Sequence, residues 1–136
     1  MTRLKKPLAR LVTRERICRV ATVGRSRVPH VVPVCYVLVD GKLYFASDND
    51  ARKVINLRAN GNVAVVVDLY AEDWSNLKGV MIQGRTAFIE RGPRYRKIRG
   101  LLYEKYPQYP DEAALKEGEA LLVEVTPRHV FAWGFE

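Results

Sequence analysis

Two adjacent cations stand where a strand gives way to a helix, and this placement could hold a phosphate. Residues 47–57 read SDNDARKVINL, so Arg52 and Lys53 fall in the first turn of the predicted helix. A cation at that end opposes the helix dipole by roughly 0.3–1 kcal/mol, and a bound anion would relieve this cost. Free backbone N–H groups, the Ser47 hydroxyl and two cations are the groups that bind a phosphate.

An ordinary structural interpretation of the same segment remains open. Asp48 and Asp50 could offset the charges of two solvated basic side chains, and either acid, or Ser47, could be the helix N-cap. The local sequence does not decide between the two interpretations.

The strands before this helix would place it beside a second feature. Asp40-Gly41 joins the apolar runs 28–39 and 42–46, which predicts a β-hairpin with a two-residue turn. In that register Ser47 lies opposite Val34. The possible phosphate site would then adjoin the second predicted strand.

Two strand positions predict irregular pairing. Pro33 lacks an N–H group, so pairing should fail on one side of it and leave backbone groups free for a planar ligand. A bulge or a barrel corner explains Pro33 equally well. Gly84, preceded by Gln83, likewise indicates a bulge or a close backbone approach.

Reactive side chains are otherwise scarce. His30 and His129 have no metal-ligand spacing, so we expect no metal site, and no nucleophile elbow, P-loop or dinucleotide fingerprint is present. Cys18 and Cys35 lie in apolar runs that predict buried thiols. With a turn at Arg25-Ser26, Cys18 would face Pro33, too far from Cys35 for an unstrained disulfide. Catalytic residues stay unknown, and such a chain would leave the chemistry to a cofactor.

Composition and charge limit the classes of partner that the protein is expected to bind. The 136 residues predict one domain, 1–136, and the net charge of +8 favours an anionic partner. The basic run 91–99 is typical of a solvated helix face, and no nucleic-acid-binding signature accompanies it, which argues against nucleic acid. The apolar run 31–39 is far shorter than the ~18 residues of a membrane span. A cytoplasmic protein without a membrane partner is the expectation.

Periodicity and turn residues predict an α+β barrel. Asn60-Gly61-Asn62 should end the helix after residue 50 with a left-handed cap. A loop at 70–77 carries an exposed-looking Trp74. The other predicted helices are 7–16, 93–106 and 111–117, and the predicted strands are 17–23, 28–39, 42–46, 63–69, 78–90, 120–125 and 128–135.

The chain resembles the pyridoxamine-phosphate-oxidase-like, flavin-binding split-barrel superfamily, above all its small members that act with FMN or a deazaflavin coenzyme. The resemblance rests on the order of elements and on four segments: RKVINL at 52–57, EDWS at 72–75, QGRTA at 83–87 and TPRHVF at 126–131. It implies a six- to seven-stranded antiparallel split β-barrel with short flanking helices. It also implies a homodimer with cofactors at the subunit interface.

The resemblance further assigns cofactor contacts. Lys53 matches the family lysine at the phosphate, and Arg58 is an additional candidate there. The ring would lie along the second strand, and aromatic and amide side chains would close the pocket, with Trp133 reaching the partner's site. The implied cofactor-binding set is Val32, Pro33, Val34, Ser47, Arg52, Lys53, Trp74, Gln83 and Trp133.

The implied activity is FMN-dependent transfer of hydride or electrons to or from a small organic substrate. In the full-length oxidases an arginine and a serine precede the lysine where this chain has Asp50 and Ala51, so vitamin B6 oxidation does not follow. A deazaflavin coenzyme is the alternative cofactor, because its polyanionic tail would suit a basic rim. That rim would comprise Arg25, Arg27, Lys5 and Lys6. A non-catalytic module that binds flavin or nucleic acid is an alternative of another class.

Overall fold

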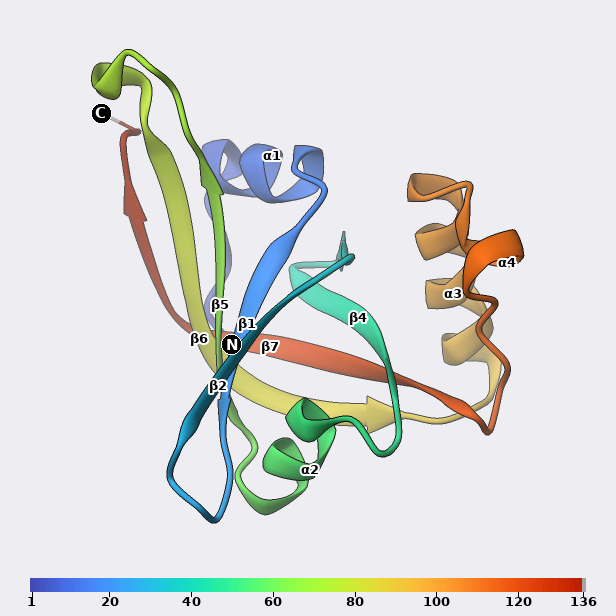
Figure 1. The fold of residues 1–136 in the computed structure, drawn as a ribbon. Helices are drawn as coiled ribbons and strands as arrows, with labels where there is room; N and C mark the ends of the chain where they lie inside the picture. The colour runs from blue at the N-terminus through green and yellow to red at the C-terminus, as the bar shows by residue number, and fades with distance from the viewer. Residues whose placement is uncertain (136) are drawn as a thin grey trace.

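Seven antiparallel strands form one curled sheet in the computed structural model, which describes residues 1–135 (Figure 1). Their order is β2-β1-β5-β6-β7-β4-β3, so the two edge strands follow each other in the chain. This is the predicted α+β split barrel. The strands are β1 (Cys18–Val23), β2 (Pro29–Val34), β3 (Val37–Val39), β4 (Lys42–Asp48), β5 (Asn62–Leu69), β6 (Lys78–Ile89) and β7 (Ala120–Trp133).

Short helices flank the sheet at separate places (Figure 1). The helix α1 (Lys6–Arg14) contributes buried Leu8, Leu11 and Val12 to the barrel core, and α2 (Arg52–Ala59) contributes Val54 and Leu57. The helices α3 (Pro93–Lys105) and α4 (Tyr109–Glu112) lie together at the right of Figure 1, apart from α1 and α2. A short turn, η1 (Trp74–Asn76), connects β5 to β6.

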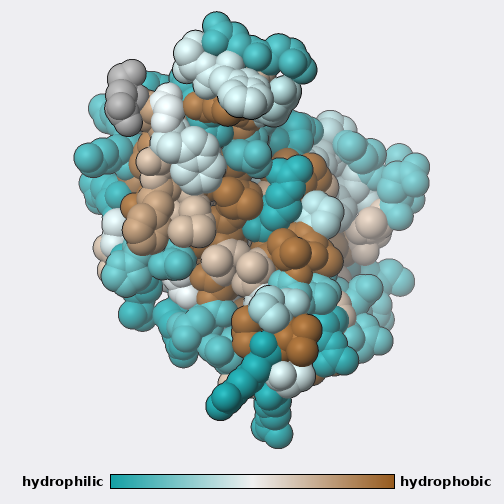
Figure 2. All heavy atoms as spheres, turned by 60° about the vertical axis from the view of Figure 1, so that its left-hand side comes forward, coloured by the Kyte–Doolittle hydropathy of each residue, from teal (hydrophilic) through white to brown (hydrophobic). Residues whose placement is uncertain are grey.

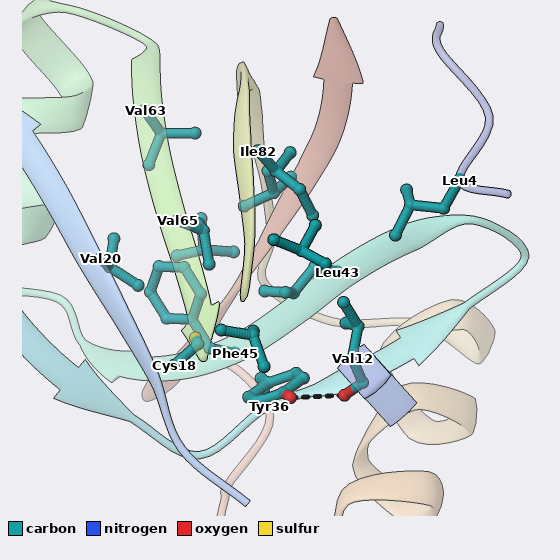
Figure 3. Close-up of a cluster of buried hydrophobic side chains, with 14 of the residues drawn as sticks. Leu4, Val12, Cys18, Val20, Tyr36, Leu43, Phe45, Val63, Val65 and Ile82 are labelled. Atoms are coloured by element: carbon teal, nitrogen blue, oxygen red, sulfur yellow. Dashed lines mark hydrogen bonds between the residues drawn. The ribbon is translucent and has the colours of Figure 1, made fainter. Parts of the chain in front are cut away.

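Alternating residues of each strand point into the barrel and form its core (Figure 3). Val20, Val65 and Ile82 come from three neighbouring strands and are almost fully buried. The Tyr36 hydroxyl donates to the carbonyl oxygen of Val12, which joins α1 to the corner between β2 and β3. A second apolar cluster fixes α3 against the sheet through Ile98, Leu102, Tyr44 and Leu122.

The predicted strand 28–39 is wrong, because the chain turns a corner at Cys35 and Tyr36. The Tyr36 side chain is fully buried there, and its backbone N–H donates to the Tyr106 hydroxyl at 3.1 Å. The break separates β2 from β3 and opens the barrel between them. The Asp40-Gly41 turn is confirmed, since Val39 pairs with Lys42, but Ser47 pairs with Leu121 and not with Val34.

Two further local predictions are wrong. Cys18 pairs with Val34 and not Pro33, because the first turn is longer than two residues and Arg27 adopts a φ of 62° in it. Both cysteines are free, but only Cys18 is buried as predicted, because Cys35 lies at the corner after β2 and is half-buried. Asn60 ends α2 in an extended conformation, with a φ of −146°, and its side-chain oxygen accepts from the N–H of Asn62 at 3.1 Å. That bond replaces the left-handed cap.

The predicted irregularity at Gly84 is confirmed. The register between β6 and β7 shifts between Gln83 and Gly84, and a Cβ atom on Gly84 would lie 2.3 Å from the Thr126 carbonyl oxygen. The bulge also lets β7 continue through Pro127 as one strand, where the sequence predicts two.

Candidate functional site

At the start of α2 the backbone N–H groups of Arg52 and Lys53 have no partner within residues 1–135, whereas the N–H of Val54 donates to the carbonyl oxygen of Ala51 at 3.0 Å. None of the predicted capping side chains is the N-cap; that position is Ala51, which offers no side-chain acceptor. The Ser47 hydroxyl is buried and donates to the carbonyl oxygen of Asp48 at 3.1 Å. The first N–H groups of a helix have no partner within the helix, so this end can accept an anion.

Lys53 lies at this helix start and is half-buried. Its pKa is lowered because burial penalises the ammonium form, and the nearby Asp48 carboxylate only partly opposes that effect. Within residues 1–135 Lys53 has no ion pair or hydrogen bond. An anion beside it would favour the charged form.

A hollow of about 440 Å³, here called the α2 hollow, separates α2 from the β1–β2 turn. Arg58 is already engaged, because its guanidinium donates to Asn49 at 3.1 Å and lies over the Phe88 ring. Arg25 and Arg52 have no acceptor within residues 1–135, so two unpaired cations border the hollow. The lining residues, which include no carboxylate, are Arg25, Ser26, Arg52, Ile55, Asn56, Arg58 and Ala59.

His30 adds a group that sequence reasoning did not assign to the site. It pairs with Thr22, so both side chains lie on one face of the sheet. The Thr22 hydroxyl accepts from the side-chain amide of Asn56 on α2 at 3.0 Å. The Nδ1 atom of His30 is buried without a partner within residues 1–135. Only the pairing across β1 and β2 shows that His30 shares a face with a residue bonded to α2.

The predicted ring residues lie on two faces of β2. Val32 and Val34 are half-buried and pair with Val20 and Cys18, which point into the barrel. Pro33 is exposed on the opposite face. β2 is an edge strand, the place in a sheet where a proline, which lacks an N–H group, is tolerated.

The remaining predicted residues lie away from the start of α2 in the same chain. Trp74 is 73% exposed in η1, at the far end of β5, whose eight residues span roughly 26 Å. The Trp133 ring covers Gly79 near the same end. Gln83 is exposed midway, opposite Ala64 and beside the bulge. One chain therefore brings Ser47, Arg52 and Lys53 together, but it does not bring the tryptophans to them.

The sheet face that carries Trp133 is notably apolar. Val31, Phe131 and Trp133 are 64%, 49% and 45% exposed. In the view of Figure 2, apolar side chains gather in the middle of the face, with polar side chains around them. Contiguous exposed apolar surface of this kind marks an interaction site.

The other basic segments do not form one binding surface. Arg94 and Arg96 on α3 pair with Glu124 at 3.0 Å and Glu117 at 3.1 Å, and Arg99 donates to the Leu115 carbonyl oxygen. Intramolecular contacts thus occupy most of the run 91–99. The predicted basic rim is divided as well, since Lys5 and Lys6 border hollows beside α1, away from the α2 hollow.

Metal-binding clusters and membrane-spanning helices are both absent from residues 1–135. No three or more His, Cys, Asp or Glu side chains of that range are placed together to hold a metal ion. None of its helices has the length and apolar character needed to span a membrane.

Comparison with known proteins identifies similar chains. A family model described as pyridoxamine 5'-phosphate oxidase matches residues 4–134. No curated protein matches the chain. Among solved structures, an FAD-binding protein from Mesorhizobium loti is 23% identical, with a TM-score of 0.76 over 95% of this chain and 94% of that one.

Two other similar structures belong to proteins with different ligands in their names. HutZ, the heme storage protein from Vibrio cholerae, is 18% identical, with a TM-score of 0.78 over 96% of this chain and 94% of that one. An F420 reductase is 18% identical, with a TM-score of 0.71 over 94% of this chain and 98% of that one. At these identities the likeness shows the fold alone.

Proposed function

The chain belongs to the pyridoxamine 5'-phosphate oxidase family, and from this premise we propose that it binds FMN and transfers hydride or electrons to or from a small organic substrate. The observation that carries the proposal is the start of α2, where the side-chain cations and the backbone N–H groups of Arg52 and Lys53 have no partner within residues 1–135 and the Asp48 carboxylate offsets the charge of Lys53 only in part. A cofactor phosphate supplies the missing negative charge.

The phosphate end would be held by Lys53 and Arg52, with the Ser47 hydroxyl beside them. Desolvation of Lys53 supports this role, because a half-buried ammonium gains most from a phosphate partner. His30 supports it too, since its buried Nδ1 lacks a partner within residues 1–135 and it shares a face with Thr22, which is bonded to α2.

The ring would lie against Val32 and Val34, on the face of β2 shared with His30. These half-buried apolar side chains suit a flat aromatic system and exclude water from one side of it. FMN supplies the hydride and electron chemistry when bound, and the protein binds and orients it. The exposed backbone edge of β2 offers hydrogen bonds to the ring.

A second copy of the chain would complete the site. The exposed apolar residues Val31, Phe131 and Trp133 supply a surface for a homodimer. Trp74 and Trp133 lie remote from α2 in their own chain, and Gln83 lies away from the start of α2, so these three residues would serve the partner's cofactor.

A deazaflavin coenzyme is the second candidate cofactor. Arg25 and Arg52, which line the α2 hollow, favour it, because its polyanionic tail would extend beyond the phosphate into this basic space. FMN ends at its phosphate and leaves Arg25 without an anion.

Absorption spectroscopy and mass spectrometry of the purified protein test the proposal. We expect a copurifying or readily bound flavin, or a deazaflavin with its band at shorter wavelength. A protein that takes up neither cofactor at high concentration would contradict the proposal. A heme Soret band would instead point to heme as the ligand.

A further inference from the structure

Lys105, the last residue of α3, has a buried amine that the proposed cofactor site does not use. Its Nζ atom has no acceptor within residues 1–135 and lies 4.0 Å from the centre of the Tyr36 ring and 5.4 Å from that of Tyr106. The residue also borders a hollow of about 280 Å³ beside the edge strand β3. This hollow is lined by all three residues of β3 together with Thr13, Leu101, Glu104 and Lys105.

The surroundings of Lys105 favour the neutral amine. Burial, and secondly the positive charge of Arg16, lowers the pKa of Lys105 from 10.5 to about 8. At pH 7.5 roughly a quarter of this amine is then neutral, against about 0.1% for a lysine with the ordinary value. A neutral lysine that is desolvated beside another cation is an activated nucleophile.

Arg16 places a positive charge next to this amine. Its guanidinium donates to the backbone carbonyl oxygen of Lys105 and lies 4.7 Å from the centre of the Tyr106 ring. Glu15 is the carboxylate whose charge opposes that of Arg16 at Lys105, and it pairs with Arg14 at 3.4 Å. Arg16 therefore disfavours an ammonium group on Lys105 and would stabilise an anionic group there.

The other titratable groups around the amine carry no charge near neutral pH. Burial raises the pKa of Cys18 to about 12 and also raises the pKa of Cys35, so both thiols stay protonated. Burial likewise raises the pKa values of Tyr36 and Tyr106. Glu104, the carboxylate that lines the hollow, is exposed, so solvent screens its charge. These groups do not oppose a negative charge on Lys105.

We propose that the Lys105 amine binds carbon dioxide reversibly as a carbamate that Arg16 stabilises. The amine nitrogen attacks the carbon of CO₂ and forms a C–N bond, while one C=O electron pair moves onto oxygen. The nitrogen then releases one proton to solvent, so Lys–NH₂ and CO₂ give Lys–NH–COO⁻ and H⁺ without any further reactant. Because CO₂ is small and uncharged, its entry into a buried site costs little.

This site is separate from the proposed cofactor site and from the surface proposed for the homodimer. None of the residues that line the hollow beside β3 belongs to the implied cofactor-binding set or to the exposed group Val31, Phe131 and Trp133. The proposed phosphate site lies on α2, whereas Lys105 lies on α3, at a different part of the barrel (Figure 1).

Trapping of carbamates on the full chain tests the proposal. The protein is equilibrated with ¹³C-labelled bicarbonate and CO₂ at pH 7.5, triethyloxonium converts carbamates into stable ethyl esters, and peptide mass spectrometry locates the label. We expect label on Lys105 and on the α-amino group of Met1, which is the internal positive control. Lys97, an exposed lysine of the same helix, should stay unlabelled.

Substitution of Arg16 tests the stabilising charge. Arg16→Gln should lower the labelling of Lys105 at least threefold relative to Met1, whereas Arg16→Lys, which keeps the charge, should retain most of it. Labelling of Lys105 no greater than that of Lys97 while Met1 is labelled would overturn the proposal. Equal labelling of Lys105 in wild type and Arg16→Gln, or equal loss in both Arg16 variants, would also overturn it. Because Lys105 and Lys97 are compared in the wild-type chain, the proposal stays testable if Arg16→Gln does not fold.

Discussion

The side-chain amide of Asn56 donates a hydrogen bond to the Thr22 hydroxyl across 3.0 Å and ties α2 to β1. Both residues are buried, and a Cβ atom on Gly24 would lie only 2.4 Å from the Asn56 side-chain oxygen. This contact sets the position of α2 relative to β2, because His30 on β2 pairs with Thr22. The hydrogen bond between Asn56 and Thr22 therefore helps to position both the proposed phosphate site on α2 and the proposed ring site on β2.

Asn56→Ala should lower the free energy of unfolding by about 1–3 kcal/mol, because it leaves the buried Thr22 hydroxyl without its donor. Urea denaturation measures the change. Asn76→Ala is the matched control, since Asn76 is exposed in η1 and its side chain makes no hydrogen bond within residues 1–135. Equal stability of the two variants would show that the Asn56 bond does not hold α2.

Lys53→Ala should weaken FMN binding by about 1.5–3 kcal/mol, the usual worth of a hydrogen bond to a charged group. Fluorescence titration of the apoprotein with FMN gives the dissociation constant. Lys97→Ala removes the same charge from an exposed position of α3 and should leave the affinity unchanged. An affinity unchanged in both variants would remove Lys53 from the phosphate site.

Gly84→Ala should destabilise the protein by about 1–3 kcal/mol, because its Cβ atom would collide with the Thr126 carbonyl oxygen and disturb the bulge. Gly100→Ala is a suitable comparison, since a Cβ atom at this position of α3 would meet no heavy atom within 4 Å. That variant should gain roughly 0.5–1 kcal/mol from helix propensity. Thermal unfolding of both variants shows whether glycine is needed at position 84 because of the close contact with Thr126, and not only for its backbone freedom.

Lys105 should give the stability of the protein a distinctive pH dependence. Its Nζ atom is buried without an acceptor within residues 1–135, 4.0 Å from the centre of the Tyr36 ring. Burial, and secondly the positive charge of Arg16, lowers its pKa from 10.5 to about 8.

Between pH 8 and 10.5 the unfolded chain binds the Lys105 proton more tightly than the folded chain, so this residue's contribution to stability rises with pH. Wild type should therefore gain stability relative to Lys105→Met across this interval, as measured by urea unfolding at each pH. Lys97→Met should show no such trend. A difference between wild type and Lys105→Met that stays constant with pH would contradict the assignment.

Phe131→Glu should convert the proposed homodimer into a monomer, because it places a charge in the apolar outer face. Sedimentation velocity at several concentrations measures the change. Ile55→Glu puts the same charge on a 44% exposed residue of α2 and should leave the assembly intact. A wild-type protein that sediments as a monomer at high concentration would contradict the dimer itself.

Apart from the break within 28–39 and the single strand β7, the sequence by itself determined the order of strands and helices, together with the Asp40-Gly41 hairpin and the irregularity at Gly84. These features depend on local periodicity and turn chemistry, which a short window of residues contains. The basic start of α2 was equally visible, because Arg52 and Lys53 are neighbours in the chain.

Tertiary structure alone decided where the barrel opens and which cations of residues 1–135 remain unpaired. The break at Tyr36 depends on burial of its ring and on the Tyr106 hydroxyl, 70 residues away. The meeting of His30, Thr22 and Asn56 follows from strand register. Register is set by pairing between distant segments, and no local pattern contains it.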